Sequence, residues 1–158
     1  MKPKFFSNLL LFSLFGIALG FFGILYEGIV YGPKFLDVSM ERMLFWKSFT
    51  SIISPIPYYI PIYPLATILL VFLSFRAPRE KPEQKKRLQA ASLFQVAALV
   101  LTFYILTQIN FKGSFGNLEK YAVEIPHKVL LFNILSVLRI GLAAVALTLT
   151  FKAFVRTN

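Results

Sequence analysis

The chain has 158 residues, of which 57% are hydrophobic, 16% aromatic and 15% charged, and its net charge is +10. One small water-soluble core cannot bury so much apolar surface, so a lipid bilayer is the simpler solvent for this chain. The absence of cysteine excludes disulfides, thiolate-bound metals and iron–sulfur clusters, and the placement of the basic residues at the ends of apolar stretches argues against nucleic-acid binding.

Four apolar windows, residues 5–26, 48–75, 88–111 and 129–151, can each cross hydrocarbon about 30 Å thick, which takes roughly 20 helical residues. The first three windows contain no charged residue, and the fourth contains only Arg139. We therefore predict an all-α protein, a polytopic four-helix bundle that forms a single transmembrane domain over residues 1–158. Its spans should cover about residues 5–30, 48–75, 88–111 and 128–151.

Basic residues divide unequally between the two sides that four spans create. Ten lie on the side of the two termini and six on the other, so the positive-inside rule predicts an integral protein of the cytoplasmic membrane, N-in and C-in. The inner loop at residues 76–87 should attract anionic lipid headgroups. Residues 1–20 also imitate a secretory signal, but the three further spans favour a first span that is retained. The ten are Lys2, Lys4, Arg76, Arg79, Lys81, Lys85, Lys86, Arg87, Lys152 and Arg156, and the six are Lys34, Arg42, Lys47, Lys112, Lys120 and Lys128.

The first span holds several glycines near one helical face, where small residues let helices approach closely in lipid. They are Gly16, Gly20, Gly23 and Gly28. After Glu27, at the outer end of the span, Tyr31-Gly32-Pro33 predicts a turn. Apolar residues at helical spacing within residues 38–53 then indicate either a short amphipathic helix at the outer interface or the wet beginning of span 2, with Trp46 as an interfacial anchor.

Residues 54–64 contain four prolines, which remove backbone donors and clash with the preceding turn. We expect span 2 to be broken or kinked here and to recover regular helix from about Pro64. Tyr58, Tyr59 and Tyr63 belong to this segment, either as members of an aromatic belt at the outer interface or as the wall of a pocket.

Polar residues in spans 3 and 4 point to an interior cluster. Gln95 lies deepest in span 3 and should hydrogen-bond to another helix, whereas Asn110 lies at the outer end of that span. In span 4, Asn133, Ser136 and Arg139 form one polar stripe, and Arg139 lies about 16 Å below the outer surface by the helical rise. An isolated guanidinium at that depth must face the bundle interior.

Glu27 is the carboxylate whose position allows it to reach Arg139. One interpretation is a structural ion pair that locks span 1 to span 4. The other is that Arg139, with Asn133, Ser136 and Asn110, binds an anionic or carbonyl-bearing amphiphile from the outer leaflet, since arginine recognises carboxylates and phenolates through planar paired donors.

His127 is the only histidine, and it stands beside Pro126 at the outer end of span 4. One histidine cannot supply two haem ligands or a usual zinc site, so we expect no metal and no other cofactor. Its ordinary pKa of about 6.5 suits a proton acceptor for a phenolic or enolic substrate. A merely solvated loop histidine is the other interpretation.

Four segments taken together carry a resemblance to a known family. They are YEGIVYGPKF after the glycine-bearing first span, LFWKSF before span 2, TQIN closing span 3 with Asn110, and FNILSVLRIGLAA in span 4 with Asn133 and Arg139. In this order they resemble a family of four-span membrane proteins, of largely unknown function, that includes the fungal anthrone oxygenases. The resemblance implies a pocket for a hydrophobic, oxygenated aromatic or lipid-like molecule and, in the oxygenase branch, oxygenation without an evident metal.

The leading functional hypothesis is that the protein binds, and as a further step oxidises, a small hydrophobic or amphiphilic molecule in the outer half of the bundle. Arg139 with Asn133 would stabilise an anion or enolate, and Glu27 or His127 would remove a proton. If it is an enzyme, the resemblance implies a cofactor-independent oxidoreductase. The alternative is an accessory or assembly subunit, a homo-oligomer or a part of a larger membrane complex, without catalysis of its own. A transporter is the third reading, which four spans without an inverted repeat rarely support.

Overall fold

The computed structural model describes residues 3–31, 39, 41, 44–45, 47–49, 56–78, 80–108 and 125–155. Its elements are α1 (Pro3–Tyr31), α3 (Ile56–Tyr59), α4 (Ile62–Arg76), α5 (Pro82–Ile105) and α7 (Ile125–Val155), and these described parts contain no strand. Four helical stretches, Lys4–Val30, Pro57–Arg76, Pro82–Gln108 and Leu130–Val155, are long and apolar enough to span a membrane. The prediction of an all-α chain with four candidate spans is therefore confirmed.

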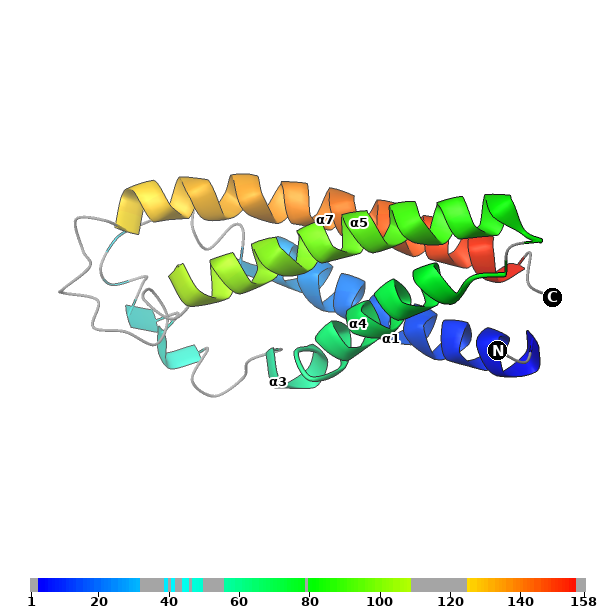
Figure 1. Ribbon diagram of the computed structural model, residues 1–158. Coiled ribbons are helices and arrows are strands. Elements are labelled where there is room, and N and C mark those ends of the chain that lie inside the picture. The colour runs from blue at the N-terminus through cyan, green and yellow to red at the C-terminus, as the bar shows by residue number, and fades with distance from the viewer. Residues whose placement is uncertain are drawn as a thin grey trace.

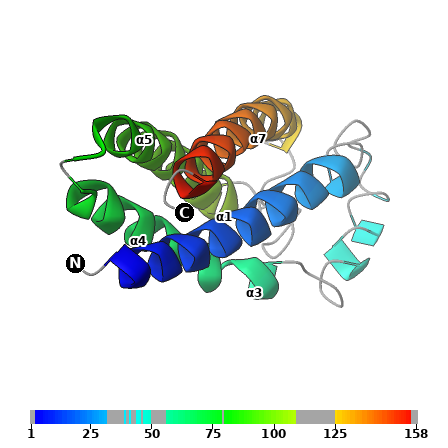
Figure 2. The ribbon, with the colours of Figure 1, turned by 90° about the vertical axis from the view of Figure 1, so that its right-hand side faces the viewer.

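The four long helices lie side by side along one axis, and the two chain termini lie at the same end of the molecule (Figure 1). Helix α1 packs against α4 and α7, and α5 packs against the same two helices, so the principal contacts close a ring. Seen from the end that holds the termini, α1 lies below α5 and α7 and crosses α4 at an angle (Figure 2). Large apolar side chains such as Phe12, Phe22 and Ile29 remain exposed on the outside, as lipid-facing residues do.

Gly16, Gly20 and Gly23 of α1 form the surface on which α3 and α4 pack, whereas Gly28 faces Ile140 of α7. A Cβ atom added at Gly20 would overlap the ring of Tyr63, and one added at Gly23 would lie 2.5 Å from Cδ1 of Tyr59. Nearer the termini, Ser13 donates a hydrogen bond of 2.9 Å to the carbonyl of Ala66. The two tyrosine rings can reach the bundle interior because α1 has no side chains in their way.

The second membrane segment is divided. Helix α3 ends at Tyr59, a turn occupies Ile60 and Pro61, and α4 begins at Ile62. Pro61 has no amide hydrogen, and its ring would clash with a continuing turn before it. Regular helix returns two residues earlier than predicted, because Pro64 falls in the first turn of α4, where its missing amide needs no partner.

Helices α5 and α7 begin earlier than predicted. Helix α5 begins at Pro82, so Lys85, Lys86 and Arg87 belong to its first turns and the inner connection is shorter than the predicted loop. Helix α7 already begins at Ile125, before the predicted span. Most of residues 38–53, where the interfacial helix is expected, lie outside the described residues, and so does Trp46.

Among the described residues, two apolar clusters lie at different depths in the interior. Near the termini, Leu10 and Ile17 of α1 pack with residues of α4, α5 and α7. Farther along, Tyr59 and Tyr63 pack with Ile24, Ala98 and Ala143. Gln95 is fully buried and donates a 3.1 Å hydrogen bond to the hydroxyl of Thr67, which confirms its predicted role between helices.

Candidate functional site

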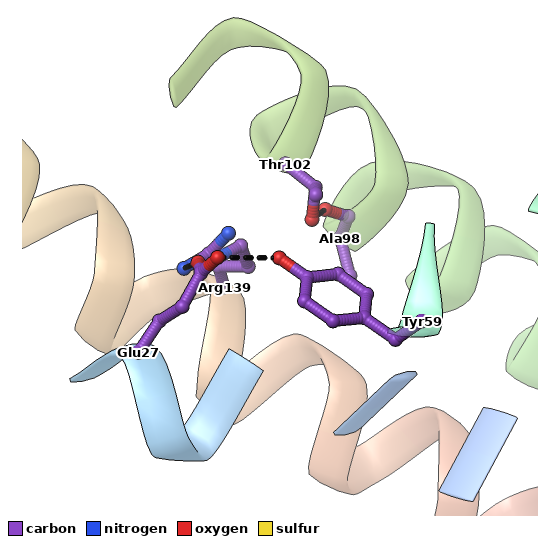
Figure 3. A network of polar contacts seen from close by, with 5 residues as sticks. All are labelled: Glu27, Tyr59, Ala98, Thr102 and Arg139. Atoms are coloured by element: carbon purple, nitrogen blue, oxygen red, sulfur yellow. Dashed lines mark hydrogen bonds and ion pairs between the residues drawn. The ribbon is translucent and has the colours of Figure 1, made fainter. Parts of the chain in front are cut away.

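A buried ion pair and a tyrosine hydroxyl form the polar centre of the half of the bundle remote from the termini. Nη2 of Arg139 donates to Oε2 of Glu27 at 2.9 Å, and the hydroxyl of Tyr59 donates to Oε1 of the same carboxylate at 2.6 Å. Figure 3 shows these three side chains converging from α7, α1 and α3. Both carboxylate oxygens therefore have a donor, one of them charged. We call these three residues, together with the buried polar side chains of Tyr63 and Ser136, the Arg139 cluster.

The ion pair is almost completely withdrawn from solvent, since each of its two side chains is only 1% exposed. The predicted interior orientation of Arg139 and its predicted pairing with Glu27 are therefore confirmed. The pair joins the last turns of α1 to the middle of α7, positions 112 residues apart in the chain. At low dielectric, a pair of this kind is stable only if further hydrogen bonds satisfy both groups. Tyr59 supplies one of them.

Three buried polar atoms near this pair have no hydrogen-bond partner among the described residues. They are Nε of Arg139, the hydroxyl of Ser136 and the hydroxyl of Tyr63. Ser136 precedes Arg139 by about one helical turn on the same face of α7, and Tyr63 lies within electrostatic reach of Arg139 and beside Gln95. An unsatisfied buried donor costs about 1–3 kcal/mol, so a further polar group that reached these atoms would stabilise the interior.

Helix α5 contributes two residues that sequence reasoning missed. Ala98 and Thr102 face the cluster, and the Thr102 hydroxyl donates to the Ala98 carbonyl at 2.8 Å (Figure 3). Both residues are buried. Residues 95, 98 and 102 share one helical face. The position of Gln95 deep in the predicted third span was therefore the signal that could have identified this face of α5.

The structure assembles only some of the predicted site residues. Glu27, Tyr59, Tyr63, Ser136 and Arg139 are buried together in the same half of the bundle, and Asn133 is half-buried one turn before Ser136. Tyr58 is not brought into the cluster, because its side chain is 75% exposed. It neighbours Tyr59 on α3, and adjacent helical residues point about 100° apart.

Two predicted residues cannot be placed in the cluster. Asn110 lies outside the described residues. The backbone of His127 is in the first turn of α7, but its side chain is likewise outside them. Within the described ranges, no three carboxylate, histidine or cysteine side chains come together as metal ligands would.

Removing the Tyr59 hydroxyl should weaken the protein through Glu27. We expect Tyr59→Phe to lower the free energy of unfolding by about 1.5–3 kcal/mol, the usual contribution of a hydrogen bond to a charged group. The measurement is denaturation in mixed micelles, with Tyr58→Phe as the control. That variant should leave stability unchanged because Tyr58 is exposed. Equal effects of the two substitutions would contradict the assigned hydrogen bond.

Comparison of this chain with models of protein families, with curated proteins and with solved structures yields no match.

Proposed function

We propose that this protein binds a small hydrophobic or amphiphilic molecule, through a carbonyl or phenolic oxygen, at the Arg139 cluster. We further propose that it is an integral protein of the cytoplasmic membrane with both termini in the cytoplasm. The ten basic residues on the side of the termini support this orientation. The cluster then belongs to the outer half of the bundle, where a ligand enters from the outer leaflet.

One observation carries the binding proposal: in the half of the bundle that holds the buried charged pair, three buried polar atoms have no hydrogen-bond partner among the described residues. Two of these atoms belong to hydroxyls, which donate or accept, and Nε of Arg139 is a donor only. An oxygen of a bound molecule placed among them would accept from Arg139 and from a hydroxyl at once. The apolar remainder of the molecule would lie among the surrounding aliphatic and aromatic side chains.

The charge balance of the cluster restricts the ligand. Glu27 already compensates the formal charge of Arg139, so a neutral carbonyl or phenol can bind without leaving a net buried charge. If the bound molecule loses a proton, the donors of Arg139 remain close enough to stabilise the resulting oxygen anion. The cluster therefore favours molecules that form enolates or phenolates.

Oxidation of the bound molecule is the second part of the proposal, and it draws on the resemblance to the anthrone oxygenases. Glu27 or His127 would remove the proton that yields the enolate, and Arg139 with Asn133 would hold its oxygen. With anthrone as the probe, dioxygen would take up the electrons and the products would be anthraquinone and water. We expect purified protein to accelerate oxygen uptake with anthrone, and Glu27→Gln to abolish the acceleration. No acceleration by the wild type would refute this part and leave the binding proposal standing.

The binding proposal is tested by extracting bound small molecules from purified protein and comparing variants by mass spectrometry. Arg139→Lys keeps a cation opposite Glu27 but lacks the planar fork, and Ser136→Ala removes one hydroxyl. We expect a molecule bearing a carbonyl or phenol in the wild type and at least a tenfold lower content in Arg139→Lys, consistent with the loss of about 1.4 kcal/mol of binding. Thr150→Val, at the other end of α7, should retain the wild-type content.

Two outcomes would contradict binding at the cluster. Equal content in Arg139→Lys and the wild type would leave the cluster a purely structural ion pair. A wild-type preparation that carries no such molecule but migrates with another protein would favour the alternative of an accessory or assembly subunit. Thermal unfolding of each variant separates loss of ligand from loss of fold.

A further inference from the structure

A second site lies at the opposite end of the bundle from the Arg139 cluster. Helices α1 and α7 enclose a groove of about 550 Å³ between their terminal halves. Its walls include Leu11, Phe15 and Ala18 of α1 and Thr148, Phe151 and Phe154 of α7. The Thr148 hydroxyl donates to the carbonyl of Ala144 at 2.9 Å, so its own helix satisfies it and the groove presents an apolar surface.

Cationic and polar side chains stand at the end of this groove nearest the termini. Lys4 lies about two helical turns before Leu11 on α1, and Asn8 lies about one turn before it. The three residues share one helical face. On α7, Lys152 lies one turn beyond Thr148. All three side chains are exposed. Among the residues that the structure describes, neither lysine forms an ion pair, whereas Lys86 pairs with Glu83.

We propose that this groove binds an anionic phospholipid of the leaflet nearest the termini. An acyl chain occupies the apolar groove between α1 and α7, and the phosphate and its acidic headgroup lie toward Lys4 and Lys152, with Asn8 as a further donor. The exposed rings of Phe15 and Phe151 lie beside this acyl chain. The groove supplies apolar contact while the two ammonium groups supply the preference for an anionic headgroup. This inference does not depend on the function proposed for the Arg139 cluster.

Charge distinguishes a lipid from a second copy of the protein as the occupant. Two copies that packed this face symmetrically would bring together two sets of Lys4 and Lys152, all of the same sign. None of the described acidic residues forms an ion pair with Lys4 or Lys152. An anionic headgroup neutralises both lysines, and an acyl chain is as apolar as the groove walls.

The test counts lipids retained by the full chain in native mass spectrometry. The protein is reconstituted with phosphatidylglycerol or, separately, with phosphatidylcholine of the same acyl chains. We expect wild-type protein to retain one phosphatidylglycerol, and Lys4→Gln/Lys152→Gln to bind it at least about tenfold more weakly, as two lost headgroup contacts imply. The charge-matched control Lys34→Gln/Lys128→Gln, on the side predicted to lie opposite the termini, should keep the lipid with less than about a twofold change.

A second variant tests the groove itself. Ala18→Trp fills the space between α1 and α7 without altering the charge, and it should displace the lipid while the helix content and the melting temperature remain near the wild-type values. Equal retention of both lipid types, equal losses in the two lysine pairs, or undiminished binding by Ala18→Trp would each overturn the proposal. So would a dimer that forms in place of the lipid adduct and dissociates in Ala18→Trp.

Discussion

Replacement of Arg139 by leucine is expected to destabilise the folded protein by about 3–5 kcal/mol, because it leaves the buried carboxylate of Glu27 without its charged partner. The Tyr59 hydroxyl alone cannot compensate for that charge. Replacement of Glu27 by leucine should cost a similar amount, since it leaves an uncompensated guanidinium at membrane depth. The free energy of unfolding is measured by denaturant titration in mixed micelles for each variant.

The double variant Glu27→Leu/Arg139→Leu decides whether the two losses arise from one interaction. We expect it to be destabilised by less than either single variant, because no buried charge remains and apolar side chains replace the pair. The Tyr59 hydroxyl then lacks its acceptor, so Tyr59→Phe in this background should be neutral or stabilising. Thr150→Val provides a control on the same helix, outside the Arg139 cluster. Additive losses from the two single substitutions would contradict a coupled ion pair.

Gly20→Ala should lower the free energy of unfolding by about 1–3 kcal/mol, the usual cost of overpacking. Its new Cβ would overlap the ring of Tyr63, so either α1 and α4 must separate or the ring must leave the Arg139 cluster. Because Tyr63 packs with Tyr59 and Ile24, its displacement should also loosen the contacts on which Glu27 depends. The effect is measured by the same denaturant titration.

Gly141→Ala is the matched control for this prediction, since an added Cβ at Gly141 meets no other atom within 4 Å. The same chemical change should therefore leave stability unchanged or raise it by up to about 1 kcal/mol, as alanine favours helix over glycine. Tyr63→Leu should recover part of the loss in the Gly20→Ala background. Equal effects at Gly20 and Gly141 would show that the close approach of α1 and α4 contributes nothing to stability.

The resemblance to the anthrone oxygenase family remains a prediction. It rests on a few polar positions in four apolar helices, and one of them, Asn110, lies outside the described residues. The oxygen-uptake experiment with anthrone and the ligand extraction therefore test it directly.

Four candidate membrane spans, and a pairing of Arg139 with Glu27 as one of two interpretations, could be predicted from the sequence alone. The lengths of its apolar stretches set the candidate spans, because crossing hydrocarbon takes a minimum number of helical residues. The pairing of Arg139 with Glu27 followed from the cost of an isolated cation in lipid and from the position of the carboxylate in the first span.

How neighbouring residues divide between the interior and the exterior depends on the packing of the helices and is not visible in the sequence. Tyr59 is buried and Tyr58 exposed because the break at Pro61 sets the rotation of α3, and a pattern of prolines does not specify that angle. The Tyr63 ring against Gly20 and the groove beside Ala18 likewise depend on the relative rotation of two packed helices. Apolar helices in lipid carry little sequence signal for that rotation, because their inward and outward faces are both hydrophobic.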